Sequence, residues 1–262
     1  MPQSIITLTT DFGAGSPYVA QMKGVLLTLN PAATIVDITH NVPPQDVRQG
    51  ARVLDEVARW FPAGTIHVVV VDPGVGTDRR IVCALIDERY YIAPDNGLLT
   101  LVARKRRPTR IAAVTNPAHW LKNVSNTFHG RDIMAPVAAS LSLGVELSEF
   151  GASILDLVEL DWPEVDVGEH RVRGSVVSFD SFGNLITDIT ADSLTELGEP
   201  SQLRVQCGPH VVNGVVATYA ERPRKSLAAL IGSSGFLELA IVNGHAAKTL
   251  GVRVGDEVIV RG

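Results

Sequence analysis

A strand that ends in a carboxylate and continues into a glycine-rich turn with an arginine is the part of this sequence best suited to build a chemical site. Four consecutive valines, residues 68–71, precede Asp72, and the turn that follows ends in Arg79. A continuous β-branched run is typical of a central strand covered on both faces, and ligands in such sheets sit at the carboxyl ends of strands. Asp72 is therefore a candidate site carboxylate, although Asp-Pro-Gly is also good turn chemistry, and Arg80 is an alternative to Arg79.

Further polar clusters lie in loops or where strands are expected to end. They span residues 9–13, 94–97, 128–132, 179–184, 232–238 and 242–245. The Asp-Phe-Gly and His-Gly-Arg-Asp strings at 11–13 and 129–132 resemble motifs of protein kinases, but here they stand in the wrong order and lack the phosphate loop and its lysine. The Gly-Val-Gly string at 74–76 is followed by another strand instead of a helix, which argues against a dinucleotide-binding fingerprint.

A metal site is an alternative use of the same polar groups. Its candidate ligands are Asp11, Asp72, Asp95, His129 and Asp132. Scattered Asp and His residues can converge in a fold, but the sequence has no compact ligand motif, and the charge of Arg79 near Asp72 competes with a cation. We therefore expect a site that uses no metal.

The composition describes a globular, mildly acidic chain. Of the 262 residues 45% are hydrophobic, no apolar stretch approaches the length of a membrane span, and no signal peptide is evident. We therefore expect a cytoplasmic protein without a membrane partner. The formal net charge of −5 argues against a nucleic-acid partner, and the basic cluster at 104–107 is expected to cap a helix end. Cys83 and Cys207 are expected to be small buried hydrophobes.

Alternating strand-like and helix-like segments predict an α/β N-terminal domain with a central, mostly parallel sheet. The expected strands are 4–8, 34–38, 65–71, 81–86 and 90–92, and the expected helices are 16–29, 46–60, 98–105 and 132–143. After a linker at 161–164, short strands are expected at 171–179, 185–189, 203–207, 211–215, 236–242 and 257–260. Strands with little helix predict a smaller C-terminal, all-β barrel-like domain. The expected domains are residues 1–161 and 162–262.

Taken in order, five motifs resemble one family over essentially the whole chain. They are Thr-Asp-Phe-Gly at 10–13, Val-Asp-Pro-Gly-Val-Gly-Thr at 71–77, Ala-Pro-Asp-Asn-Gly at 93–97, Phe-His-Gly-Arg-Asp at 128–132 and Ser-Phe-Gly-Asn at 181–184. Together they resemble the S-adenosylmethionine (SAM) hydrolases, also called SAM hydroxide adenosyltransferases, which are relatives of the fluorinase and chlorinase.

The resemblance implies a homotrimer whose active sites lie between the N-terminal domain of one subunit and the C-terminal domain of its neighbour. It also implies hydrolysis of SAM to adenosine and L-methionine by attack of water on ribose C5′. No metal and no organic cofactor takes part in that reaction.

By the resemblance, Asp72, Arg79 and His129 form the group that holds and activates water. Free water is a poor nucleophile because its pKa lies far above neutral pH, so a metal-free site must activate it with side chains. Arg79 supplies positive charge that favours hydroxide, His129 orients the water or takes its proton, and Asp72 orients the cluster and accepts hydrogen bonds. The sequence leaves open which of the three receives the proton.

The resemblance also assigns substrate contacts. Asp11 is the carboxylate that takes both ribose hydroxyls. Asn184 is the adenine-contacting amide, and Phe182 offers apolar surface beside it. Asp180 is a candidate for the methionine ammonium and Ser233 for the methionine carboxylate. The remaining contacts to adenine and the amino-acid end are assigned to Glu238 and to the backbone around Val242 and Asn243.

Differences from the halogenating relatives at the halide pocket indicate whether the nucleophile is water or a halide. Where those enzymes carry a tyrosine and a threonine at the halide pocket, this chain has Asp72 and Val75, and where they carry a halide-binding serine it has Gly130. A carboxylate in that pocket repels a halide anion, so water is the expected nucleophile. A halogenase is the close alternative. A metal-dependent hydrolase and a non-catalytic SAM-binding module are alternatives of other classes.

Overall fold

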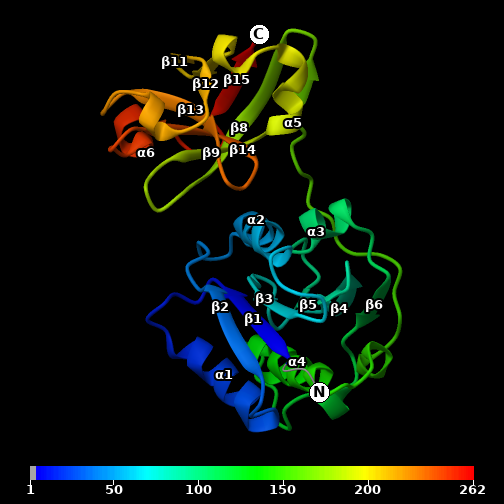
Figure 1. Ribbon diagram of the computed structural model, residues 1–262. Helices are drawn as coiled ribbons and strands as arrows, with labels where there is room; N and C mark the ends of the chain where they lie inside the picture. The colour runs from blue at the N-terminus through cyan, green and yellow to red at the C-terminus, as the bar shows by residue number, and fades with distance from the viewer. Residues whose placement is uncertain (1–3) are drawn as a thin grey trace. The chain divides into compact units, whose positions relative to one another are not determined.

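The computed structural model describes residues 4–262. The chain divides into two compact units, Met1–Asp161 and Trp162–Gly262. The first combines strands and helices, and the second consists mainly of strands (Figure 1). Among residues 4–262 no helix has both the length and the apolar character needed to cross a membrane.

The first unit is built around a six-stranded sheet. Its strands are β1 (Ile5–Thr10), β2 (Thr34–Thr39), β3 (Ile66–Val70), β4 (Ile81–Ile86), β5 (Arg89–Pro94) and β6 (Arg110–Ala113). They lie in the order β2-β1-β3-β5-β4-β6, in which the first four are parallel neighbours and β4 is antiparallel to both β5 and β6 (Figure 1). The predicted α/β fold with a mostly parallel sheet is confirmed.

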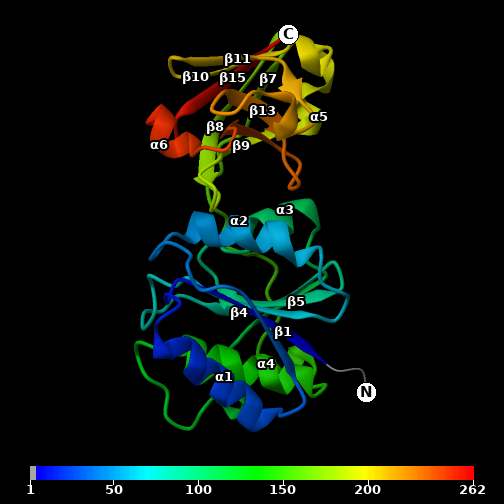
Figure 2. The same ribbon diagram turned by 60° about the vertical axis from the view of Figure 1, so that its left-hand side comes forward.

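Helices cover both faces of this sheet (Figure 2). They are α1 (Pro17–Leu29) and α4 (Ala135–Ser142) on one face, and α2 (Val47–Ala58) and α3 (Thr100–Lys105) on the other. Val68 and Val70 belong to the core under α1 and α4, whereas Val69 and Val71 belong to the core under α2 and α3. Because both faces of β3 are buried, its sequence is apolar except for His67.

The β4–β5 hairpin fixes the position of Arg79, which lies just before it in the chain. Its ladder begins with Ile81 opposite Pro94, and its turn consists of Asp87 and Glu88. Both turn residues have positive φ, 48° and 61°, as a two-residue type I′ turn requires. Arg79 stands two residues before this ladder, so the hairpin register sets its position.

The second unit is one bent, barrel-like sheet with short helices. Its strands are β7 (Asp166–Gly168), β8 (Arg171–Phe179), β9 (Leu185–Thr190), β10 (Arg204–Cys207), β11 (His210–Asn213), β12 (Val215–Val216), β13 (Leu227–Ile231), β14 (Phe236–Ile241) and β15 (Glu257–Arg261). Their order is β11-β10-β15-β8-β9-β14-β13-β12, with β7 pairing β8. The first half of β8 pairs with β15 and the second half with β9, which lets one long strand serve both halves of the sheet. The predicted all-β, barrel-like class is confirmed.

Some predicted elements differ from the structure for identifiable reasons. The helix predicted over 132–143 begins earlier, as the π-helical segment η2 (Gly130–Met134) that continues into α4. Pro136 has no N–H to offer the carbonyl of Asp132, and that carbonyl instead accepts the N–H of Leu121 at 2.9 Å.

Alanine content explains two strands that were not predicted, and one glycine explains a strand that is divided in two. Strands β6 and β13 were not predicted, because both contain paired alanines, which favour helices. The strand predicted over 211–215 is two strands, β11 and β12, separated at Gly214, whose φ is 79°. Cys83 and Cys207 are buried free thiols, as predicted. Arg104 and Lys105 lie in the last turn of α3, where the basic cluster was expected.

Candidate active site

The three residues predicted to be catalytic form one hydrogen-bonded group. Arg79 donates from Nε to both carboxylate oxygens of Asp72 at 3.0 Å and from Nη2 to Oδ2 at 2.6 Å. The same Nη2 donates to Nδ1 of His129 at 2.8 Å. The side chains of Asp72 and Arg79 are only 5% and 12% exposed, so their ion pair is largely removed from bulk solvent.

Three separate segments bring this group together. Asp72 follows β3, Arg79 precedes β4, and His129 precedes η2. The turn from Asp72 to Arg79 packs on the loop that leads to His129. Gly76 makes this approach possible, since its φ is +81° and a Cβ there would overlap the carbonyl oxygen of Asn126.

The neighbouring Arg80 pairs with two carboxylates outside this group. Arg80 donates from Nε to Asp95 at 2.7 Å and from Nη2 to the exposed Asp156 at 3.0 Å. Asp95, whose side chain is 2% exposed, also accepts the N–H of Val158 at 2.8 Å. Arg80 therefore ties the 156–158 segment to the end of β5. Of the two arginines considered from the sequence, Arg79 is the one beside Asp72 and His129.

The contact with Arg79 defines the protonation of His129. A guanidinium can only donate, so Nδ1 of His129 must be the acceptor, and in the neutral ring Nε2 carries the hydrogen. Burial, together with the positive charge of Arg79, lowers the pKa of His129, against the opposing influence of Asp72 and Asp132. His129 is thus a neutral ring at pH 7 that presents an N–H from Nε2.

Asp11 lies at the end of β1, beside β3 in the sheet. Its Oδ2 accepts the N–H of Gln45 at 2.8 Å, a contact that holds the loop between β2 and α2. The next residue, Phe12, meets the ring of Phe128 edge-on, with ring centroids 5.6 Å apart. Since Phe128 precedes His129, this aromatic contact couples the Asp11 loop to the loop that carries the histidine.

A cavity of about 280 Å³ opens on Arg79 and His129. Its other lining residues come from the start of β4, the end of β6 and the loops around them: Thr77, Asp78, Arg80, Ile81, Ala113, Val114, Thr115, Trp120 and Ile133. The indole Nε1 of Trp120 is buried and has no hydrogen-bond partner among the described residues. The sequence analysis did not single out Trp120, because a lone tryptophan in a loop carries no pattern.

In the second unit, three of the predicted substrate residues belong to one polar chain. Asp180 accepts from the Nδ2 of Asn184 at 2.8 Å, and from the backbone N–H groups of Phe182 and Asn184 at 2.9 and 2.8 Å. Nδ2 of Asn184 also approaches the hydroxyl of Tyr219 at 3.5 Å, and that hydroxyl donates to Glu238 at 3.0 Å. Tyr219 was missed from the sequence, because only the fold places it between Asn184 and Glu238.

Burial and the hydrogen bond to Glu238 raise the pKa of Tyr219 to about 12, so its hydroxyl stays protonated. Gly232 leaves the space that Glu238 fills, since a Cβ at Gly232 would overlap the Glu238 carboxylate. Ser233 lies exposed in the turn between β13 and β14. Phe182 is 75% exposed, which leaves its ring available for a ligand.

The backbone proposed around residues 242 and 243 is already engaged. The N–H of Val242 donates to Ser226 at 3.0 Å, and the carbonyl of Val242 accepts from Lys225 at 2.8 Å. The carbonyl of Asn243 accepts Nζ of the same lysine at 2.7 Å. A ligand at this position would compete with these contacts, and the two residues remain a prediction.

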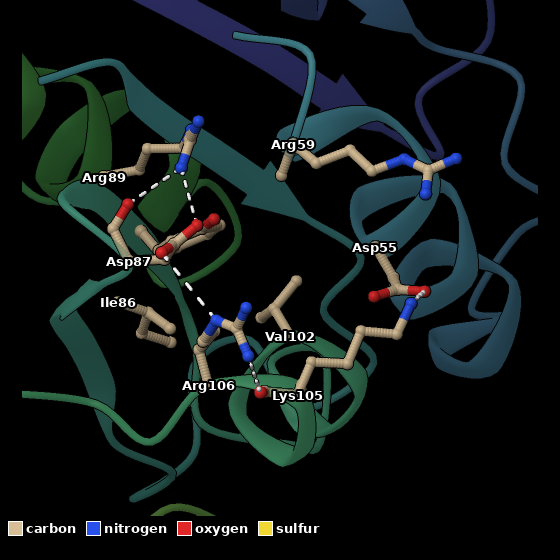
Figure 3. A pocket seen from close by; sticks show the side chains of 10 residues that line it. Asp55, Arg59, Ile86, Asp87, Arg89, Val102, Lys105 and Arg106 are labelled. Atoms are coloured by element: carbon tan, nitrogen blue, oxygen red, sulfur yellow. Dashed lines mark hydrogen bonds and ion pairs between the residues drawn. The ribbon is translucent and has the colours of Figure 1, made fainter. Parts of the chain in front are cut away.

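A second cavity of about 300 Å³ lies beside the β4–β5 turn (Figure 3). Arg89 donates there to the carboxylate and the carbonyl of Asp87, at 2.9 and 2.8 Å, and to the carbonyl of Phe61 at 2.8 Å. Lys105 pairs with the largely buried Asp55 at 2.7 Å. These cations are held by structural partners, and no residue predicted for the site lines this cavity.

The candidate metal ligands do not converge. Asp95 is paired with Arg80, and the fully buried Asp132 is held by Arg131 at 2.6 Å and by the N–H of Ser125 at 2.8 Å. Within residues 4–262 no group of three or more His, Cys, Asp or Glu side chains is arranged to hold a metal ion.

Known proteins resemble the chain along nearly its whole length. Residues 6–151 match the family model of the SAM hydroxide adenosyltransferase N-terminal domain, and residues 174–259 match that of the C-terminal domain. The (R)-S-adenosyl-L-methionine hydrolase of Salinispora tropica is 39% identical, over 99% of this chain and 98% of that protein. A fluorinase of Nocardia brasiliensis is 31% identical, over 98% and 96%. The crystal structure of an uncharacterized conserved protein from Thermotoga maritima gives a TM-score of 0.94 at 37% identity, covering 98% of this chain and 100% of that one.

Proposed function

The chain belongs to the SAM hydroxide adenosyltransferase family, and on that premise we propose that it hydrolyses S-adenosyl-L-methionine to adenosine and L-methionine. The observation that carries the proposal is the hydrogen-bonded group of Asp72, Arg79 and His129. In this reaction an oxygen of water attacks ribose C5′, the C5′–S bond breaks, and its electron pair neutralises the sulfonium as the thioether of methionine. One proton is released.

The free donors of the group favour a negatively charged nucleophile. Within the described residues Nη1 of Arg79 and Nε2 of His129 have no partner, so each of these atoms is available to donate to water. Two donors and one positive charge stabilise hydroxide relative to water. Because Nε2 of His129 already carries a hydrogen, His129 orients the oxygen and Asp72 is the better acceptor for the proton.

The remaining rate acceleration comes from the way the enzyme positions the substrate. The sulfonium is a good leaving group, so the enzyme must chiefly hold C5′ between the attacking oxygen and the sulfur. Asp11 is proposed to bind both ribose hydroxyls, since a carboxylate accepts from a vicinal diol through two oxygens. The polar chain of Asp180, Asn184 and Glu238, with Phe182 and Ser233, is proposed to bind adenine and the methionine end.

A homotrimer with shared sites is proposed as the working form, in the cytoplasm. It is supported by the division of the proposed ligands, since Asp11, Asp72, Arg79 and His129 belong to the first unit and Asn184 and its neighbours to the second. Light scattering should give the mass of three chains.

Mixed assemblies test the sharing of sites. A His129→Ala protein lacks a site residue of the first unit, and an Asn184→Ala protein lacks one of the second unit. Their co-expression should therefore restore part of the activity, at sites where an intact first unit of one chain meets an intact second unit of another. Assemblies that regain nothing would mean that each site is built within one chain.

Product analysis tests the reaction. Purified protein is incubated with SAM, and adenosine, methionine, S-adenosylhomocysteine and methylthioadenosine are separated. We expect adenosine and methionine in equal amounts, also after exhaustive chelation. Loss of activity on chelation would favour the metal-dependent alternative, and absence of any product would favour a binding module.

Parallel reactions in fluoride and in chloride test the halogenase alternative, which the similarity to a fluorinase supports. A 5′-halogenated adenosine would establish it. The expected product is adenosine alone, because Gly130 and Val75 stand where the halogenating relatives carry hydroxyl groups.

A further inference from the structure

Three residues that line the cavity beside Arg79 and His129 carry a hydrogen-bond donor that has no protein acceptor among the described residues. These donors are Nη1 of Arg79, Nε2 of His129 and Nε1 of Trp120. Donors that share one cavity require acceptors, and an N–H left buried without one costs about 1–3 kcal/mol. Water is the usual acceptor in such places, and a volume near 280 Å³ holds several water molecules.

The position of the cavity in the sheet separates it from the proposed ribose ligand. In the sheet, β1 lies on one side of β3, and β4 and β6 lie on the other (Figure 1). Asp11 follows β1, whereas residues at the start of β4 and the end of β6 line the cavity. Asp72 follows β3 itself. The β4 and β6 residues that line the cavity therefore lie on the side of β3 away from the strand that carries Asp11.

Trp120 is held firmly in this cavity. The next residue, Leu121, donates its N–H to the carbonyl of Asp132 at 2.9 Å, and Ser125 donates to the Asp132 carboxylate at 2.8 Å. Asp132 is fully buried and belongs to η2, the segment that His129 begins. The loop with Trp120 and the segment that follows His129 are thereby fixed to one another.

We propose that this cavity stores the water consumed in the reaction, and that Trp120 is a positioning residue whose indole N–H holds a water molecule for delivery to Arg79 and His129. The inference rests on the proposed hydrolysis. An indole N–H that donates to the stored water stabilises hydroxide relative to water, so the indole also favours ionisation of that water.

Detection of the stored water does not depend on activity. In protein labelled with ¹⁵N-tryptophan, the indole N–H signal that Trp120→Phe removes belongs to Trp120. This signal should show a nuclear Overhauser contact to a long-lived water, whereas the signal of Trp60, which is 73% exposed, should exchange with bulk solvent. Absence of a long-lived water at Trp120 would overturn the proposal even if the wild type proves to be a hydrolase.

Kinetics of the same variant test the positioning role. Trp120→Phe removes the donor and keeps a similar ring, so we expect kcat to fall about tenfold, KM for SAM to stay within twofold, and the kcat profile to move to higher pH. Trp60→Phe is the matched control and should behave as wild type. A Trp120→Phe protein with wild-type kcat and pH profile would overturn the proposal, whereas a wild type that forms no adenosine would instead overturn the proposed function.

Discussion

Asp72→Asn is the substitution that tests the active site most directly. The carboxylate receives three contacts from Arg79, and both side chains are largely buried, at 5% and 12% exposure. An asparagine keeps one oxygen but turns an NH₂ group toward the guanidinium, which leaves a buried charge without its counter-ion. Removing one partner of a buried pair typically costs about 3–5 kcal/mol. Since Arg79 is not fully buried, we expect the lower end, about 3 kcal/mol.

The expected kinetic loss is larger than a loss of stability alone would give. Without Asp72 the Nη2 group of Arg79 is no longer held against His129, and the proton has lost its acceptor, so kcat should fall roughly 10²–10⁴-fold. The remaining activity should rise with pH, because hydroxide from solvent then replaces the water that Asp72 deprotonates.

Asp156→Asn is the matched control, because Asp156 is an exposed carboxylate paired with the adjacent Arg80. Exposed ion pairs contribute little to stability, so this variant should keep wild-type kcat and unfolding midpoint. Urea unfolding followed by tryptophan fluorescence, together with adenosine release at saturating SAM, measures both effects. An Asp72→Asn protein with kcat within threefold of wild type would refute the assignment of Asp72 to the catalytic group.

Three further outcomes are expected. Buried His67, whose pKa is lowered to about 4 by burial and by the charge of Arg89, binds a proton only in the unfolded chain between pH 6.5 and about 4. Stability should therefore be lost as pH falls through this range, by about 3 kcal/mol at 1.36 kcal/mol per unit, and His67→Gln should show a correspondingly shallower loss in urea unfolding. Burial and the positive charge of Arg79 both lower the pKa of His129, and Arg79→Gln removes that charge. The acid limb of the kcat/KM profile should therefore move to higher pH. An acid limb that does not move would mean that a group other than His129 titrates there. Asp11→Asn should raise KM about 10- to 100-fold with little change in kcat, and an unchanged KM in initial-rate measurements would remove Asp11 from the ribose site.

The sequence predicted the parts of the fold that depend on local pattern. The valine run before Asp72 forms most of β3, and the hydrogen-bonded group of Asp72, Arg79 and His129 lies at the carboxyl end of that strand. The alanine-containing strands β6 and β13 escaped prediction because their partners in the sheet, and not their intrinsic propensity, make them extended. Segment η2 is π-helical because the carbonyl of Asp132 accepts the N–H of Leu121, outside the helix. A contact between such distant residues cannot be predicted from a local pattern.

The candidate site, too, could be predicted only in part. Asp72, Arg79 and His129 were identified through a family resemblance, and the structure adds which arginine is used and which imidazole nitrogen accepts. Trp120 and Tyr219 were missed because their hydrogen-bonding groups matter only through neighbours distant in sequence. Asp180 was assigned to a substrate ammonium, yet its oxygens already accept three N–H groups of its own loop, so a ligand would share them.

The β4–β5 hairpin gives the enzyme a point of control far from its chemistry. The register of the ladder sets the place of each residue that precedes it, so a slip of one residue would bring Arg80 to the place that Arg79 now holds. A guanidinium would still lie beside Asp72, but it would come from a different position on the backbone. The choice between two adjacent, chemically identical groups is therefore made at the opposite end of the hairpin, by the left-handed turn at Asp87 and Glu88 that Arg89 clamps in place.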